Sequence, residues 1–201
     1  SLQQGPRHTV KVLGLGAGTL AAYGRPGDAI VFYEIDPQVI AYAEGEGGFF
    51  SYLADSPADV EIVEGDARLS LVRDLQVGGG GDTDLLLVDV FSGDSPPVHL
   101  LTREALALYL AHMAPDGLLA INVSTTHVDL KPVIAGLARE AGLRGVIVED
   151  RGDGRACFAS RWVVMAADPG LLSGAAWTGY PDLQRAYEPG MRLWTDDYTN
   201  L

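Results

Sequence analysis

The sequence predicts an α/β protein with a doubly wound, mostly parallel seven-stranded sheet and one antiparallel edge strand. Short apolar segments alternate with helical patterns along residues 9–141, which is typical of repeated β–α units. A glycine-rich turn follows the first apolar segment, as in many open sheets that bind a ligand. Two apolar segments near the end are joined by a turn-rich stretch without a helical pattern, which indicates an antiparallel pair.

The individual elements follow from the spacing of apolar residues. Residues 85–90, LLLVDV, are almost continuously apolar, as expected for a strand that is covered on both faces. Pro37 stands at a helix-opening position, and Thr102 is expected to cap the helix that follows it. Strands are expected at 9–13, 29–35, 60–63, 85–90, 117–123, 146–149 and 162–167, and helices at 17–23, 37–44, 67–75, 102–113 and 130–141.

The length of 201 residues suits one domain. Residues 1–8 are polar and are expected to be disordered or to form the edge of an expressed fragment. Residues 9–168 are expected to form the α/β domain, and residues 169–201 an irregular, aromatic-rich tail that packs on it. The aromatic residues of the tail would also suit a partner interface, so a homodimer is one expected assembly.

Composition and charge exclude several classes of protein. Apolar residues make up 47% and charged residues 20%, which is a normal balance for a globular protein. No apolar run reaches the roughly 18 to 20 residues of a membrane span, and no signal-peptide pattern opens the chain, so we expect a cytoplasmic protein without membrane contact. The formal charge is −13 with no Lys/Arg cluster, which argues against nucleic acid and favours a cationic small-molecule partner.

The glycine-rich turn has the sequence GLGAGT. Gly14, Gly16 and Gly18 allow a tight turn and let a ligand approach backbone N–H groups at the start of the next helix. The spacing differs from the dinucleotide fingerprint, because Thr19 stands where that fingerprint requires its third glycine. We therefore expect a nucleoside-type ligand without a pyrophosphate.

Acidic residues follow the next two strands. Glu34 ends the second strand, where a carboxylate can accept hydrogen bonds from both hydroxyls of a ribose. Asp66 follows the third strand and is placed to accept an adenine amino group, with Ala67 supplying a backbone contact. The alternative for Glu34 is a solvated acid at the strand end, and Asp36 beside it could be only a helix cap. Because the carboxyl ends of adjacent parallel strands meet at one edge of the sheet, we expect Gly14, Glu34 and Asp66 to lie close together.

Two further carboxylates follow the fourth strand. Asp89 ends the most apolar strand, and an acid is costly to bury there unless it is paired or used. Asp94 lies in the proline-containing loop that follows, where it either binds a substrate amine or caps the loop. One of the two acids would take the proton of an attacking amine, and we assign this catalytic role to Asp89 and substrate binding to Asp94. No pattern of histidines and carboxylates indicates a metal. His99, His112 and His127 are expected to be solvated or capping residues.

These motifs resemble the spermidine synthase (polyamine aminopropyltransferase) family. The likeness covers about residues 9–168 and rests on GLGAGT at 14–19, EIDP at 34–37, GDAR at 65–68 and VDVFSGD at 88–94, with a similar ending, WTDDY, at 194–198. The resemblance implies the fold of the class I methyltransferases. It also implies ribose binding at Glu34, adenine binding at Asp66 and Ala67, and activation of the amine acceptor at Asp89.

The resemblance implies a donor and an acceptor. The donor would be decarboxylated S-adenosylmethionine or S-adenosylmethionine itself, and the acceptor a small cationic amine such as putrescine. In the family an acid in the glycine turn helps to hold the donor's amine, and here that position is Ala17. An S-adenosylmethionine-dependent methyltransferase and a non-catalytic ligand-binding or interaction domain therefore stay open as alternatives.

Overall fold

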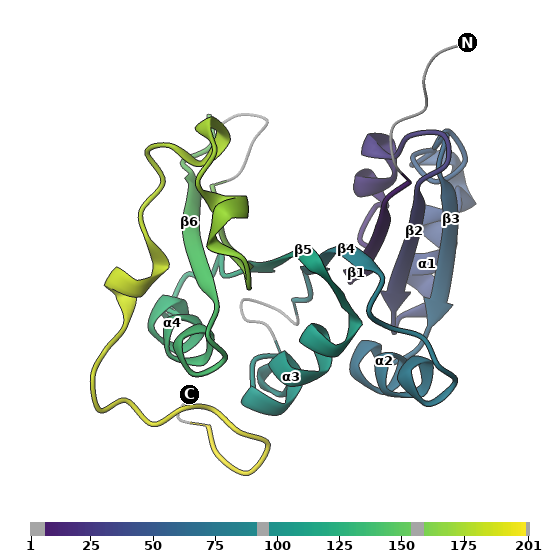
Figure 1. Ribbon diagram of the computed structural model, residues 1–201. Coiled ribbons are helices and arrows are strands. Elements are labelled where there is room, and N and C mark those ends of the chain that lie inside the picture. Colours follow the sequence, from purple (N-terminus) through teal and green to yellow (C-terminus); the bar gives the residue numbers. More distant parts are fainter. Residues whose placement is uncertain (1–6, 92–96, 154–158, 200–201) are drawn as a thin grey trace.

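A computed structural model of the protein describes residues 7–91, 97–153 and 159–199. The chain folds around one seven-stranded sheet in the order β3-β2-β1-β4-β5-β7-β6. Figure 1 shows the strands together with the helices that pack on them. The strands are β1 (Thr9–Leu13), β2 (Ala29–Glu34), β3 (Asp59–Glu64), β4 (Thr83–Val88), β5 (Met113–Asn122), β6 (Arg144–Asp150) and β7 (Ser160–Ala166). The predicted fold class is confirmed.

The strand directions explain where a ligand can bind. Strands β3, β2, β1, β4 and β5 are parallel, and β7 runs antiparallel between β5 and β6. The reversed strand thus lies next to the outermost strand β6, within the closing pair that the sequence indicated. The chain order changes direction between β1 and β4. Open α/β sheets bind ligands at the carboxyl ends of the strands beside such a change.

Among the described residues, four α-helices connect the strands: α1 (Pro37–Ala43), α2 (Ala67–Gln76), α3 (Arg103–His112) and α4 (Lys131–Glu140). Their starts follow local sequence rules. Asp36 directly precedes Pro37, and its side chain accepts a hydrogen bond from the Gln38 amide. The side chain of Thr102 accepts one from the Ala105 amide, as predicted for an N-cap. Short 3₁₀ turns are η1 (Thr19–Tyr23), η2 (Glu46–Gly48), η3 (Val98–Leu100), η4 (Pro169–Leu172), η5 (Ala175–Trp177) and η6 (Leu183–Ala186).

The helix predicted at 17–23 is wrong in type, because the structure has only the 3₁₀ turn η1 there. Gly18 adopts a left-handed conformation immediately before it, and Gly24 is extended immediately after it. Five residues lie between these glycines. The Ala21 amide donates a hydrogen bond to the Gly18 carbonyl, and the Gly24 amide donates one to the Ala21 carbonyl. A segment this short favours 3₁₀ geometry.

The two faces of the sheet are covered unequally. Helices α2, α3 and α4 lie together on one side (Figure 1) and pack on strand residues such as Leu86, Leu119 and Val163. The C-terminal segment adds Leu183 and Trp194 to this core, and both side chains are fully buried. On the other face, α1 and η1 pack over Val12, Ile30 and Phe32 at the β1–β3 side. No helix in the described part of the chain has the length and hydrophobicity to cross a bilayer.

Candidate functional site

The glycine turn passes between the ends of β2 and β4. Gly14, Gly16 and Gly18 all have positive φ, of 95°, 54° and 76°, a region that residues with a side chain rarely adopt. The Gly14 amide donates to the Tyr33 carbonyl of β2. A Cβ atom added to Gly14 would lie 2.3 Å from the Asp89 carbonyl oxygen. The turn therefore requires glycine at Gly14 for close backbone approach as well as for conformation.

Glu34 holds this turn in place. One carboxylate oxygen, Oε2, accepts from the Leu15 amide at 3.0 Å, and Oε1 accepts from the Ile35 amide at 2.9 Å and the Asp36 amide at 3.0 Å. The carboxylate thus joins the end of β2 to the glycine turn after β1. This geometry differs from that of a freely solvated acid at a strand end. The interactions orient the half-buried side chain toward the carboxyl ends of the strands.

Asp66 has two contacts. Its Oδ1 caps α2 by accepting from the Leu69 amide at 2.8 Å. Its Oδ2 lies 3.6 Å from Nε2 of His99, in the segment that faces it across a cleft. Ala67 is buried at the first position of α2. The capping bond fixes the orientation of the carboxylate and leaves its other oxygen toward the cleft.

A cleft of about 100 Å³ brings four of the predicted residues together. Gly14, Glu34, Asp66 and Ala67 all line it, at the carboxyl ends of β1, β2 and β3. Gly16 and Gly18 do not line it and shape the turn instead. The remaining wall is formed by residues that sequence reasoning did not assign to the site: Tyr33, Ile35, Gly65, Val90, Pro97, His99 and Leu100. No Lys or Arg occurs among these described lining residues.

Asp89 directly follows β4, and its backbone contacts Gly14. Its amide donates to the Leu13 carbonyl at 2.9 Å, and its Oδ1 accepts from Nδ2 of Asn122 at 2.8 Å. Burial raises the pKa of the Asp89 carboxyl, and the hydrogen bond from Asn122 opposes this shift. The group is therefore a more basic carboxylate than an exposed aspartate, held in one orientation beside the glycine turn. Asp94 lies outside the described residues.

Asn122 was missed by sequence reasoning. It is the last residue of β5, the strand next to β4, and its side-chain oxygen accepts from the Ser124 amide at 2.9 Å. That second bond fixes which end of the amide points to Asp89. The available signal was a polar residue that ends an apolar strand, which is the same signal that identified Asp89.

The C-terminal segment supports the cleft wall. Arg68 donates to the His99 carbonyl at 2.8 Å and binds both carboxylate oxygens of Asp196, at 2.8 and 2.6 Å. Thr102 also donates to Asp196, and the bond from Arg68 holds the pKa of the Asp196 carboxyl below its usual value. A pair with two parallel N–H···O bonds is among the stronger ion pairs. It ties α2, η3 and the tail together beside the cleft.

The prediction for His112 is wrong. Its side chain is fully buried, where Nδ1 lies 3.0 Å from Nζ of Lys11 and Nε2 lies 3.0 Å from the Leu71 carbonyl. Lys11 also binds Asp74 at 2.6 Å. Since a lysine ammonium has only donors, Nδ1 must accept and Nε2 must donate, so the ring is neutral. Among the described residues, no group of three or more His, Cys, Asp or Glu side chains is arranged to hold a metal.

Known proteins resemble this chain in sequence over part of its length and in fold over nearly all of it. No family model matches the sequence. The N-terminal histidine N-methyltransferase of Emericella nidulans is 34% identical over 112 residues, which are 55% of this chain and 19% of that protein. The chain thus spans about a fifth of the length of this curated relative.

Several solved structures match almost the whole chain. A probable spermidine synthase from Corynebacterium glutamicum has a TM-score of 0.64 at 20% identity, over 97% of this chain and 74% of that one. Human methyltransferase-like protein 13, solved with SAH, has a TM-score of 0.60 at 22% identity, over 96% and 87%. The predicted fold, which spermidine synthases and class I methyltransferases share, is therefore confirmed.

Proposed function

We propose that the protein binds an S-adenosyl sulfonium donor and transfers its aminopropyl group to a small cationic amine such as putrescine. The acidic character of the site carries this proposal. The carboxylates of Glu34 and Asp66 line the cleft, Asp89 lies beside its glycine turn, and no Lys or Arg occurs among the described lining residues. An acidic site of this kind attracts a sulfonium and an amine, both of which are cations.

The nucleoside of the donor would lie between Glu34 and Asp66. Each oxygen of a carboxylate offers two lone pairs, and three of the four on Glu34 already accept backbone amides. The remaining lone pair, on Oε2, can accept a ribose hydroxyl. Asp66 keeps Oδ2 available for an adenine amino group, and Ala67 presents its backbone at the same wall. No Lys or Arg occurs among the described lining residues to bind a carboxylate, which favours the decarboxylated donor, whose tail ends in an ammonium group without a carboxylate.

Asp89 would act on the acceptor. Its raised pKa suits a carboxylate that takes a proton from an ammonium group as the nitrogen attacks. The nitrogen lone pair forms a bond to the CH₂ carbon next to sulfur, and the carbon–sulfur bond breaks. The electron pair of the broken carbon–sulfur bond stays on sulfur, which gives neutral methylthioadenosine. The proton released by the amine moves to Asp89. Asn122 would keep the carboxylate aligned through this step.

Methyl transfer from S-adenosylmethionine is the second candidate. Two observations favour it. Ala17 occupies the position in the glycine turn where the synthases carry an acid for the donor's amine, and the curated relative from Emericella nidulans is named a methyltransferase. Backbone amides of a glycine turn can also bind a carboxylate. The two candidates therefore differ mainly in the donor.

The two reactions give different products, so one experiment separates them. The protein is incubated with putrescine and either donor, and methylthioadenosine and S-adenosylhomocysteine are quantified by mass spectrometry. Aminopropyl transfer predicts methylthioadenosine only from the decarboxylated donor. With protein in excess over the donor, absence of methylthioadenosine would contradict aminopropyl transfer to putrescine, and absence of S-adenosylhomocysteine would contradict methyl transfer to it.

A matched pair of variants tests the nucleoside site independently of turnover. Glu34→Gln should weaken binding of methylthioadenosine about tenfold or more, since a hydrogen bond to a charged group is worth about 1.5 to 3 kcal/mol. Glu64 ends the neighbouring strand in register with Glu34 but is exposed, so Glu64→Gln is the control and should bind normally. Binding is read from the ligand-induced rise in melting temperature. Equal binding by the two variants would argue against the ribose role of Glu34.

A further inference from the structure

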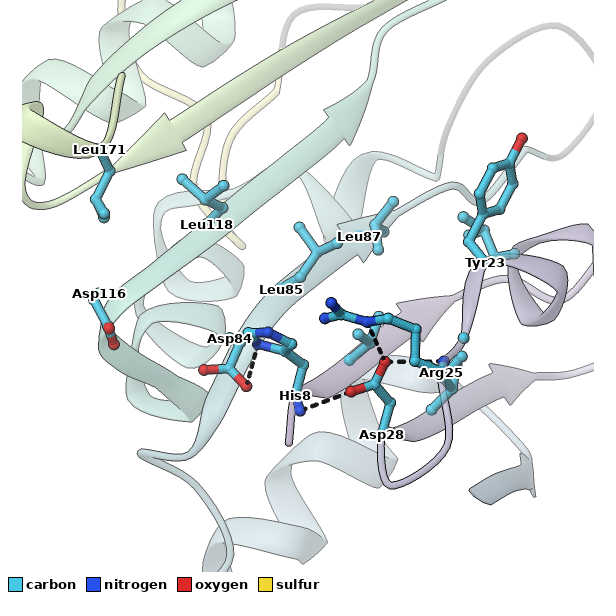
Figure 2. Close-up of a pocket in the computed structure, with 14 residues that line it drawn as sticks. His8, Tyr23, Arg25, Asp28, Asp84, Leu85, Leu87, Asp116, Leu118 and Leu171 are labelled. Atoms are coloured by element: carbon cyan, nitrogen blue, oxygen red, sulfur yellow. Dashed lines mark hydrogen bonds and ion pairs between the residues drawn. The ribbon is translucent and has the colours of Figure 1, made fainter. Parts of the chain in front are cut away.

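The centre of the sheet is hollow on the face opposite α2, α3 and α4. Cavities of about 490 and 380 Å³ lie there and share Leu85, Leu87 and Leu118 in their linings, so they form one continuous groove over β4 and β5. We call it the sheet-face groove. Figure 2 shows these three leucines between Tyr23 on one side and Leu171 on the other. Doubly wound sheets normally bury both faces under helices.

The sheet-face groove is separate from the nucleoside cleft. Its polar end carries Asp84 and Asp116, near the amino ends of β4 and β5, whereas the cleft lies at the carboxyl ends of the strands. A continuous apolar surface that folding leaves open marks an interaction site more often than a catalytic one. The groove therefore needs an occupant that the described residues do not supply.

The width of the groove matches one helix. One wall is η1 with Leu20 and Tyr23, and the other is formed by Leu171 of η4 and Trp177 of η5. Between β1 and β7 lie only β4 and β5, and strands are about 4.8 Å apart. The gap is thus about 10 to 14 Å, which accepts the 10 to 12 Å diameter of an α-helix. A second copy of the chain over this groove would instead place its own η1, η4 and η5 against these walls.

The charge of the groove also selects its occupant. Asp116 is exposed. Asp84 binds the Thr9 amide and lies 3.6 Å from His8, while Arg25 is held by Asp28. These contacts leave the end of the groove acidic in a chain whose net charge is −13. Lysine or arginine side chains of an occupant would complement these acids.

We propose that the sheet-face groove binds a basic amphipathic α-helix of a partner polypeptide. The apolar stripe of that helix lies on Leu85, Leu87 and Leu118, and its lysine or arginine residues lie over Asp84 and Asp116. The site does not depend on the proposed transferase activity, since it uses none of the residues of the cleft.

A labelled synthetic helix of about 14 residues, or four turns, tests this by fluorescence anisotropy. Its leucines follow the i, i+3, i+4, i+7 pattern and its flanks carry lysines; a second peptide carries glutamates instead. We expect saturable binding of the lysine peptide, at least about tenfold tighter than binding of the glutamate peptide. A lysine peptide with its leucines scrambled off one face should bind no better than the glutamate peptide.

Substitutions locate the binding site. Leu118→Gln should weaken binding about tenfold, whereas Leu69→Gln, at a 56% exposed position on α2 on the opposite face, should leave it unchanged. Asp116→Lys changes only an exposed side chain and should reverse the preference toward the glutamate peptide. Failure of the lysine peptide to bind, or equal binding by wild type and Leu118→Gln, overturns the proposal. A dimer in sedimentation equilibrium that Leu118→Gln dissociates also overturns it, in favour of a second copy.

Discussion

Replacing Gly14 by alanine should be far more harmful than the same change at Gly16. Both residues lie in the glycine turn and both have positive φ, of 95° and 54°. A Cβ at Gly14 would lie 2.3 Å from the Asp89 carbonyl oxygen, while a Cβ at Gly16 meets nothing within 4 Å. The pair therefore separates the cost of the close approach from the cost of the backbone conformation.

The magnitudes follow from these two terms. A left-handed conformation costs a residue with a side chain about 1 to 2 kcal/mol, and forcing an extra methyl group into a packed site costs about 1 to 3 kcal/mol. We expect a loss of about 1 to 2 kcal/mol for Gly16→Ala and about 2 to 5 kcal/mol for Gly14→Ala. At about 2 to 4 °C per kcal/mol for a chain of this size, the melting temperature should fall by about 2 to 8 °C for Gly16→Ala and about 4 to 20 °C for Gly14→Ala.

Urea unfolding followed by circular dichroism measures both free energies, and the rise in melting temperature with methylthioadenosine measures binding. Because the clash is with the backbone of Asp89, Gly14→Ala should also displace that residue and weaken the nucleoside site. Gly16→Ala should keep its ligand response. Equal destabilisation by the two variants would refute the inference that the Asp89 carbonyl is what demands glycine at Gly14.

Three further predictions concern groups whose pKa values are shifted. Burial, and after it the charge of Lys11, lowers the pKa of His112 below 6.5. The neutral ring should therefore contribute its full stability above about pH 6.5, and this contribution should decline as the pH falls toward the pKa of the folded state. His112→Gln should flatten this part of the curve of unfolding free energy against pH. Because burial raises the pKa of Asp89, kcat/KM should rise with pH through a value above that of an exposed aspartate, and Asp89→Asn should abolish the rise while retaining nucleoside binding. Asp196→Asn removes the charge that Arg68 binds and should lower stability by about 1 kcal/mol; an unchanged melting temperature at low salt would show that the pair contributes nothing.

Much of the fold could be read from local patterns. The continuous apolar run before Asp89 and the pair of segments near the end indicated the sheet, because strand periodicity and turn residues act within a few positions. The glycine turn, Glu34, Asp66 and Ala67 could be placed in one cleft from sequence, since parallel strands bring their carboxyl ends to the same edge. Local patterns gave the wrong type of element for η1, because the glycines on either side leave too short a segment for an α-helix.

Contacts between distant segments were decided by the tertiary structure alone. Asn122 lies 33 positions from Asp89, Lys11 lies 101 positions from His112, and Arg68 lies 128 positions from Asp196. No periodicity links residues so far apart, because each pair is brought together only when the sheet order and the helix packing are complete. The same holds for the sheet-face groove. Each apolar strand predicts that it will be covered, and only the assembled sheet shows that the described chain covers one face of β4 and β5 fully and the other only in part.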